Sequence, residues 1–316
     1  MWTIVNSIFW TSLGVIMLRY QLVPTNLPRL LGRSLYWIGV PLQILVLARR
    51  SDFDEAVWIP PLVTLIALLV GLIISVALLQ HWEKLKSIYV DRSIQSTWLN
   101  DLIYIVSGLP WGNKLFSKVF PFNGSGKGSF VLASMLGNTG FIGLVVIPNF
   151  VDRHYWSWIV LYGVTHNLLG SYGLGAMIAN YFSSSQASTK KIIRLEALLK
   201  VPSLWAFVIG YTTRNVALPE LVESVFKYGI MIVVPTSFFL IGMQLGKLQG
   251  IKSLKTAIVP TSLKLLILPA LVAVGLTLLG VEGDGRLALV MMSGMPTAFA
   301  NVILAEEYNL DRQIAA

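Results

Sequence analysis

Long apolar segments separated by short polar stretches run along almost the whole sequence. A helix that crosses a bilayer needs about 20 mainly apolar residues. By this criterion the pattern predicts an all-α polytopic membrane protein. Residues 311–316 are predicted to form the cap and first turn of a tenth helix, the rest of which is missing after Ala316. The nine complete spans are predicted at 2–18, 27–47, 57–79, 129–147, 156–182, 198–213, 218–245, 257–279 and 287–304.

Two of these spans are interrupted by glycine, proline and amide side chains. Gly137-Asn138-Thr139-Gly140 lies in the fourth, and Gly294-Met295-Pro296-Thr297-Ala298 lies in the ninth. A helix interior loses about 1 kcal/mol to glycine and about 3 kcal/mol to proline relative to alanine. In lipid, irregular backbone is tolerated only where it is buried in protein or lines a wet cavity. We interpret the two breaks as the substrate site of a secondary transporter.

The positions of the breaks predict an inverted repeat. Five spans lie in residues 1–182, a cytoplasmic linker is expected at 183–197, and four spans plus the start of a tenth lie in 198–316. An odd number of spans per half makes the two halves cross the membrane in opposite senses. Interrupted spans at matching positions of two halves indicate a transporter's binding site.

The long connection at 81–128 is predicted to lie at the membrane interface. Its middle, 97–106, is apolar but short and carries Asp101, which favours an interfacial helix over a full crossing. Residues 123–128 are rich in glycine but lack the spacing of a phosphate-binding loop, so we expect a flexible linker there.

Composition supports the membrane assignment. The chain of 316 residues is 55% hydrophobic and 12% charged, with a net charge of +9. Soluble proteins carry roughly 25% charged residues. Because the basic residues lie mostly in short loops, a membrane surface explains the charge and nucleic acid is not an expected partner. The absence of cysteine excludes disulfides and thiolate metal sites, and no metal or other cofactor is expected.

The distribution of Lys and Arg predicts the orientation. Of the 24 basic residues, we assign 18 to one set of alternate loops and span ends and 6 to the other. The richer set, which includes Lys264, belongs in the cytoplasm by the positive-inside rule. The N-terminus is therefore predicted to lie outside. The smaller set consists of Arg49, Arg50, Arg153, Arg214, Lys227 and Arg286.

The broken spans offer chemistry suited to an anion. A helix break leaves backbone N–H groups without partners at a positive helix N-terminus, and two such ends could hold a carboxylate without a buried cation. The cores of the fourth and ninth spans carry no charged residue. The alternative is that small and polar residues only allow close helix packing. The predicted substrate-binding residues are Gly137, Asn138, Thr139, Gly140, Met295, Pro296, Thr297, Ala298 and Asn301.

Other polar and helix-bending residues have two interpretations each. His166 is a candidate proton relay, because it is the only histidine well inside a predicted span; the alternative is a neutral imidazole bonded to Asn167 or to a carbonyl. Pro41, Pro235 and Pro269 are candidate hinges or packing bends. Glu306, after the ninth span, belongs to a solvated helix end or to an ion-coupling site, as do Glu307 and Asp311.

The two break motifs and the run Ile303-Leu304-Ala305-Glu306-Glu307 resemble the auxin efflux carrier family in its bacterial branch, related to the plant PIN auxin exporters. The resemblance implies ten helices in a five-plus-five inverted repeat, with the fourth and ninth unwound and crossing. It also implies a static scaffold domain, a mobile crossover domain and small organic anions as cargo. The plant exporters have a proline beside the asparagine of the first break, whereas here Gly137 and Gly140 flank Asn138-Thr139. The resemblance therefore does not imply that auxin itself is the substrate of this chain.

These observations predict a secondary transporter that exports a small organic anion, auxin-like or another carboxylate, by alternating access at a midplane site. A channel and a non-transporting membrane sensor are the alternatives. No catalytic motif of an intramembrane enzyme occurs. The expected partners are the anion and the lipid bilayer of the bacterial inner membrane; a homodimer is left open.

Overall fold

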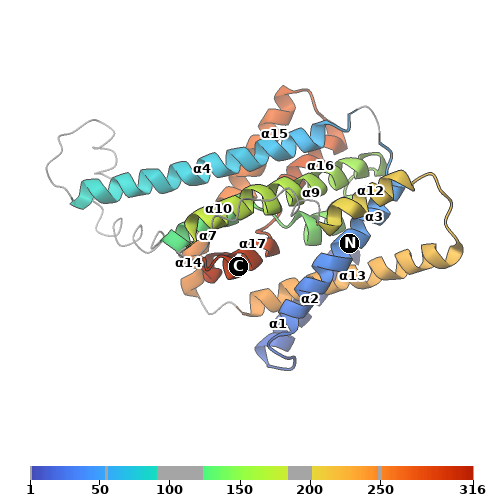
Figure 1. Cartoon of the computed structure of the whole chain (residues 1–316), viewed down its shortest axis with the longest axis horizontal. Coiled ribbons are helices and arrows are strands. Elements are labelled where there is room, and N and C mark those ends of the chain that lie inside the picture. The colour runs from blue at the N-terminus through green and yellow to red at the C-terminus, as the bar shows by residue number, and fades with distance from the viewer. Residues whose placement is uncertain (1, 54–55, 91–123, 184–200, 248–250, 316) are drawn as a thin grey trace.

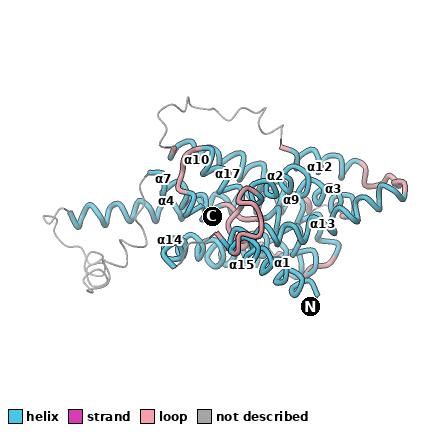
Figure 2. Tube along the Cα trace, turned by 90° about the horizontal axis from the view of Figure 1, so that it is seen from below, coloured by secondary structure: helices cyan, strands magenta, loops and turns pink. Residues whose placement is uncertain are grey.

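The computed structural model describes residues 2–53, 56–90, 124–183, 201–247 and 251–315. Almost all of these residues are helical (Figures 1 and 2), and within this part of the chain the only β-type pairing is an isolated antiparallel bridge between Gly137 and Thr297. The all-α fold class is confirmed. The inverted relation of the two halves stays a prediction.

One group consists of the first helices of each of the two predicted halves. It contains α1 (Trp2–Arg19), α2 (Leu27–Ser34), the π-helical turn η1 (Leu35–Gly39), α3 (Val40–Arg50), α12 (Pro202–Thr212) and α13 (Glu220–Gly246). Helix α1 packs along α13, and α3 packs along α12. We call this set the first helix group; it occupies one side of the molecule in Figure 1.

The remaining helices form a second group. They are α4 (Ile59–Val90), α7 (Gly124–Met135), η2 (Thr139–Gly143), α8 (Leu144–Val146), η3 (Ile147–Asn149), η4 (Arg153–Tyr155), α9 (Trp156–Thr165), η5 (His166–Gly175), α10 (Ala176–Phe182), α14 (Ile251–Ser262), η6 (Leu263–Ile267), α15 (Leu268–Leu278), α16 (Gly283–Ser293), α17 (Phe299–Glu307) and α18 (Arg312–Ala315). The two groups meet where α3 and α12 pack on α9, and where α13 packs on η2.

Four helical segments are long and apolar enough to cross a membrane: Leu27–Arg50, Ile59–Trp82, Glu220–Gly246 and Ala257–Leu278. They coincide within three residues with four of the nine predicted spans. Shorter apolar helices occupy Val5–Arg19 and Thr139–Asn149. The other predicted spans are helical over most of their described length, and their number as membrane crossings stays a prediction.

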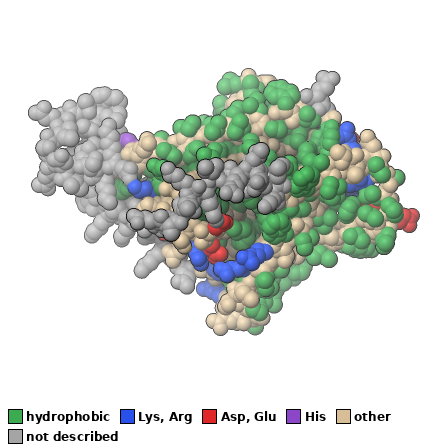
Figure 3. Space-filling view, in the orientation of Figure 1, with side chains coloured by type: hydrophobic (Ala, Val, Ile, Leu, Met, Phe, Trp, Pro, Cys, Tyr) green, Lys and Arg blue, Asp and Glu red, His purple; other side chains and the backbone are tan. Residues whose placement is uncertain are grey.

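The surface has the character expected of a protein embedded in lipid. On the described part of the face drawn in Figure 3, apolar side chains are widespread and the charged ones gather in a few places. Large apolar side chains in the candidate spans are exposed, among them Ile73 at 65%, Ile232 at 67% and Leu266 at 67%. Contiguous exposed apolar surface of this kind is unusual in soluble monomers.

Helix α4 continues past the predicted span end to Val90, since backbone hydrogen bonds can extend a helix beyond the apolar stretch that lies in lipid. One local prediction was wrong. Residues 124–128 form the first turns of α7 instead of a flexible linker, and Gly126 and Gly128 are buried there. The predicted interfacial helix at 97–106 and most of the predicted 183–197 linker lie outside the described residues.

The end of the described chain agrees with its prediction. Asp311 caps α18, because its Oδ1 accepts hydrogen bonds from the backbone N–H of Gln313 at 2.9 Å and of Ile314 at 3.3 Å. The Asp311 carbonyl accepts a bond from Ser129 Oγ at 2.7 Å, which ties this turn to α7.

Candidate functional site

The two interrupted segments meet in the structure. Helix α7 ends at Met135 and η2 begins at Thr139, while α16 ends at Ser293 and α17 begins at Phe299. Between these ends the two chains run antiparallel: Asn138 N donates to Pro296 O at 2.6 Å, and Ala298 N donates to Leu136 O at 3.1 Å. Backbone N–H and C=O groups that lose their helical partners at one break thus form hydrogen bonds with those at the other break. We call residues 136–139 and 294–298 the crossing.

Gly137 permits the close approach of the two segments. A Cβ atom at this position would lie 3.0 Å from Met295 O and 2.8 Å from the Cε atom of Lys264. Any other residue would therefore push the segments apart or displace the lysine.

Asn138 uses its side chain to begin the helix after the break. Its Oδ1 accepts a hydrogen bond from Phe141 N at 3.1 Å, which is an N-cap interaction at η2. Helix α17, on the opposite segment, begins without a side-chain cap. Asn301 N donates to Ala298 O at 3.0 Å, whereas the N–H groups of Phe299 and Ala300 have no acceptor within the described part of the chain, so this end retains donors that a ligand could use.

His166 lies beside the crossing as the first residue of η5. Its Nε2 accepts a hydrogen bond from Gly137 N at 3.2 Å, so the proton of a neutral ring is on Nδ1, which lies 3.3 Å from Thr139 Oγ1. The imidazole is fully buried and stacks against the ring of Tyr162. Its partners are therefore neither Asn167 nor a carbonyl, and its role as a proton relay stays a prediction.

Asn301 joins the same cluster from α17. Its Nδ2 donates to Leu132 O in α7 at 3.2 Å, while its Oδ1 is buried without a hydrogen-bond partner in the described part of the chain. The residue is fully buried. A buried amide oxygen without a donor costs about 1–3 kcal/mol, so Asn301 retains an acceptor for a ligand, water or alternative conformation.

Lys264 is the site residue that the pattern of the sequence did not identify. It lies in η6 with 1% exposure, and its Nζ donates to Met135 O at 3.1 Å. Within the described residues no carboxylate pairs with it. Its assignment to the cytoplasmic set was wrong, because it is buried beside the crossing. The available signal was an ionisable residue inside an apolar span, which by itself indicates function.

Four residues around the crossing lie in π-helical turns. Thr139 and Gly140 belong to η2, His166 to η5 and Lys264 to η6. Such wide turns are rare and are frequent at functional sites. Pro269 follows η6, just as Pro41 follows η1, so these two prolines accompany helix irregularities as expected.

The crossing is buried on most sides but reaches the surface at one point. Gly137, Asn138, Thr139 and Gly140 are buried, as are Met295 and Ala298, whereas Thr297 is partly exposed and Pro296 is exposed. The predicted binding residues thus lie together, and Pro296 is the exposed residue among them.

The first helix group contacts the crossing directly. Gly32 of α2 lies against the ring of Phe299, and a Cβ on Gly140 would lie 3.3 Å from the methyl groups of Val40. The rings of Phe141 and Phe299 have their centroids 6.0 Å apart. Movement of one helix group against the other would therefore change the surroundings of the crossing.

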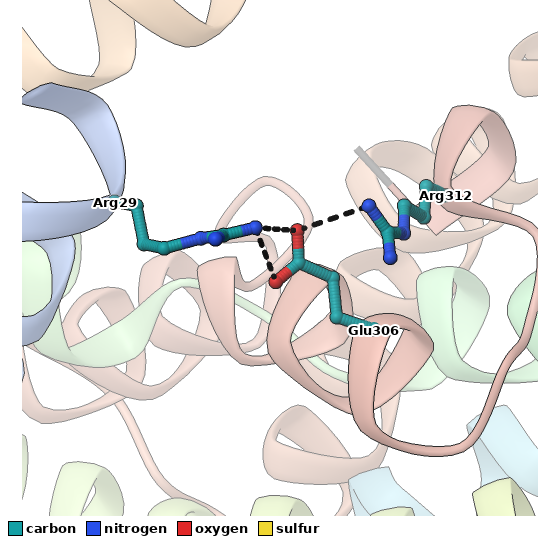
Figure 4. Close-up of polar contacts among 3 residues, drawn as sticks. All are labelled: Arg29, Glu306 and Arg312. Atoms are coloured by element: carbon teal, nitrogen blue, oxygen red, sulfur yellow. Dashed lines mark hydrogen bonds and ion pairs between the residues drawn. The ribbon is translucent and has the colours of Figure 1, made fainter. Parts of the chain in front are cut away.

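An ionic network joins the two helix groups near the end of α17. Arg29 Nη2 lies 3.2 and 3.3 Å from the two carboxylate oxygens of Glu306, and Arg312 Nη1 lies 3.5 Å from Glu306 Oε1 (Figure 4). Arg29 comes from α2, whereas Glu306 comes from α17. Glu306 is therefore more than a solvated residue at the end of a helix, because it pairs with two arginines.

Comparison with known families finds a match in the second part of the chain. The family of membrane transport proteins, which comprises the auxin efflux carriers, matches residues 183–316. The matched range covers less than half of the chain. No curated protein matches the sequence. The match over residues 183–316, together with the four apolar helices, supports an integral membrane protein involved in membrane transport.

The matched range contains α16, α17 and η6, and so supplies Pro296, Asn301 and Lys264. The residues of the other segment, from Gly137 to Gly140 and His166, lie outside it. Their assignment to a site rests on their contacts with the matched part.

Proposed function

We propose that the chain is a secondary transporter that exports a small organic anion, binding it at the crossing and alternating its access between the two sides of the membrane. The observation that carries this proposal is the antiparallel pairing of Gly137 with Thr297, between two helix breaks that are 160 positions apart in the sequence. Pairing of this kind places four helix ends in one small region inside an apolar protein.

The chemistry around the crossing favours an anion. Lys264 provides a buried cation whose described polar contact is a backbone carbonyl. The uncapped start of α17 contributes N–H donors and the positive end of a helix dipole. Thr297, Asn138 and Asn301 add neutral polar groups that would orient a carboxylate. The binding region therefore joins one formal positive charge to donors and has no carboxylate among its members.

The arrangement of the helices supports alternating access. We infer that the second helix group, which holds the crossing, moves against the first group in a five-plus-five inverted repeat with the N-terminus outside. The network of Arg29, Glu306 and Arg312 would hold the groups together on the predicted cytoplasmic side, and its separation would accompany opening.

The proposal is tested by transport in proteoliposomes. Vesicles loaded with a candidate carboxylate are expected to take up the labelled compound by counterflow, with a rate that saturates at high concentration. A thermal-shift screen of carboxylates first identifies the cargo, because a ligand that binds the folded state raises its stability. Flux that rises without saturation and shows no counterflow would identify a channel instead.

Asn138→Asp is expected to weaken binding of the anion about tenfold or more while leaving the fold intact. Aspartate keeps an oxygen that can cap Phe141 N, but it replaces the amide N–H donors. Loss of a hydrogen bond to a charged group costs about 1.5–3 kcal/mol. Anion affinity from the thermal-shift titration and the unfolding midpoint without ligand separate the two effects. Wild-type affinity in this variant would remove Asn138 from the binding site.

Glu306→Gln is expected to increase access to the crossing from the predicted cytoplasmic side several-fold. Its partners are 60% exposed and Glu306 is 34% exposed, so each pair contributes at most about 1 kcal/mol. The chain has no native cysteine, so a single Ala300→Cys substitution near the start of α17 reports access through its rate of labelling by a water-soluble maleimide in inside-out vesicles.

Glu307→Gln is the matched control, because Glu307 is the exposed neighbour of Glu306. Labelling should accelerate in the Glu306 variant alone. Equal rates in the two variants and in the parent would show that the network of Arg29, Glu306 and Arg312 does not restrain opening.

A further inference from the structure

A polar pocket that shares no lining residue with the crossing lies where α3 ends and α13 begins. Its volume is about 370 Å³, within the range of small-molecule sites. Three arginines and one carboxylate contribute to its lining: Arg49, Arg50, Arg214 and Glu223. The lining thus carries a net charge of +2, from three positive groups and one negative group. We call it the arginine pocket.

Arg49 builds the wall of this pocket. Its guanidinium donates through Nη1 to Thr213 O and through Nη2 to Val216 O, the latter at 2.7 Å. Both carbonyls belong to the segment that joins α12 to α13. Arg49 therefore holds that segment against the end of α3 and is occupied by backbone acceptors.

Aromatic rings position the Arg214 side chain, but one of its hydrogen-bond donors has no acceptor within the described part of the chain. Its guanidinium carbon lies 4.2 Å from the centre of the Tyr211 ring and 5.5 Å from that of Phe53. Its Nη1 is buried and makes no hydrogen bond within the described part of the chain. Aromatic stacking fixes the plane of the guanidinium. Buried N–H groups normally have a hydrogen-bond acceptor, so the Arg214 Nη1 donor is available to a ligand.

Arg50 is held only loosely. Its Nη2 lies 3.6 Å from Glu223 Oε2, and the two side chains are 48% and 45% exposed. Ion pairs this exposed are weak, so Arg50 can turn towards an anion in the pocket. Arg153, whose Nε donates to the Arg50 carbonyl at 3.0 Å, lies next to it.

The clustering is unexpected for this side of the membrane. Only six basic residues were assigned to the side that the positive-inside rule places outside, and four of them, Arg49, Arg50, Arg153 and Arg214, come together at this pocket or beside it. Glu223 offsets part of this positive charge, and a bound anion would offset the rest.

The remaining residues of the pocket lining are mostly apolar, which favours a ligand with an apolar part. Val46, Val216, Leu218 and Phe226 contribute to the same pocket. Arg50 and Glu220 are the end residues of two helical segments that are long enough to span the membrane, so the pocket lies at the boundary between hydrocarbon and water. We propose that the arginine pocket binds an amphiphilic anion, with its carboxylate or phosphate on Arg214 and Arg50 and its apolar part against these side chains.

The test uses two probes, because this chemistry belongs both to lipids and to soluble acids. Phosphatidylglycerol retained on the purified protein is counted by native mass spectrometry, and octanoate binding is measured by calorimetry in nanodiscs of phosphatidylcholine. Arg214→Gln is expected to weaken binding of the preferred probe about tenfold or more. Lys227→Gln, which removes the same charge from an exposed position of α13 outside the pocket, is expected to bind like the parent.

Glu223→Gln is expected to act in the opposite direction. Removing this carboxylate frees Arg50 and makes the lining more positive, so binding should tighten severalfold; a misfolded protein could not show this gain. Asn138→Asp, at the crossing, should leave binding unchanged if the two sites are distinct. A response to phosphatidylglycerol assigns the pocket to a lipid, and a response to octanoate assigns it to a soluble acid. Binding of neither probe, or equal binding by the Arg214 and Lys227 variants, overturns the proposal.

Discussion

Gly242→Ala is expected to destabilise the protein by about 1–3 kcal/mol, the usual cost of overpacking a close contact. A Cβ at this position would collide with the carbonyl oxygen of Thr11 in α1 and lie 2.8 Å from its carbonyl carbon. The opposing residue is Gly14, whose Cβ would lie 2.9 Å from Met243 N. Because every obstructing atom is backbone, helices α1 and α13 would have to move apart.

Gly275→Ala is the matched control for this substitution. Gly275 also lies within a helix, but a Cβ there meets nothing within 4 Å. Both substitutions gain the helix preference of alanine, about 0.5–1 kcal/mol, so the difference between them isolates the contact with α1. The unfolding midpoint in a fixed detergent provides the measurement. A Gly242 variant as stable as the Gly275 variant would show that α1 and α13 are not in backbone contact.

The close packing of α1 with α13 was not evident from the sequence, although the helices themselves were. Apolar runs locate candidate spans because lipid requires apolar side chains along the length of a helix. They contain no information about which helices touch. Gly14 and Gly242 are 228 positions apart, and glycine in a predicted span is equally compatible with a break, a packing contact or neither.

The breaks were predictable for a related reason. Glycine and proline weaken a helix wherever they occur, so Gly137 and Pro296 mark the ends of α7 and α16 to within a few residues. The matching positions of the breaks in the two halves predicted that both belong to one site, and the resemblance to the auxin efflux carriers implied that the two segments cross. The antiparallel pairing of Gly137 with Thr297 is a long-range contact that local pattern did not predict. At residues 124–128, by contrast, glycine suggested a break where the chain is helical. Gly128 is needed there because it packs closely against Phe182.

Lys264 shows how a pattern can conceal a site residue. Counting basic residues by loop assigns each to the nearest span end, and the count changes only from 18 to 17 when Lys264 is removed. The predicted orientation therefore does not depend on where Lys264 is assigned. The predicted chemistry of the site does depend on it, because binding by helix ends and amides alone omits the buried amine of Lys264, 3.1 Å from Met135 O.

Lys264→Met is expected to reduce transport about tenfold to a hundredfold with little change in stability. Methionine keeps an unbranched side chain of similar length, but it removes the buried positive charge and the bond to Met135 O. Burying a charge that has no ionic partner is costly, so its removal favours the folded state, whereas an unpaired carbonyl costs about 1–3 kcal/mol. These terms offset each other in the free energy of unfolding, and only the loss of charge weakens binding of the anion.

Lys264→Gln separates the charge from the hydrogen bond. Glutamine can still donate to Met135 O but is neutral, so the proposed role of the charge requires the glutamine and methionine variants to transport equally poorly. Lys227→Met, an exposed lysine on α13, should transport like the parent. Recovery of transport by glutamine would make Lys264 a support for the end of α7, and normal transport by Lys264→Met would exclude the residue from the site.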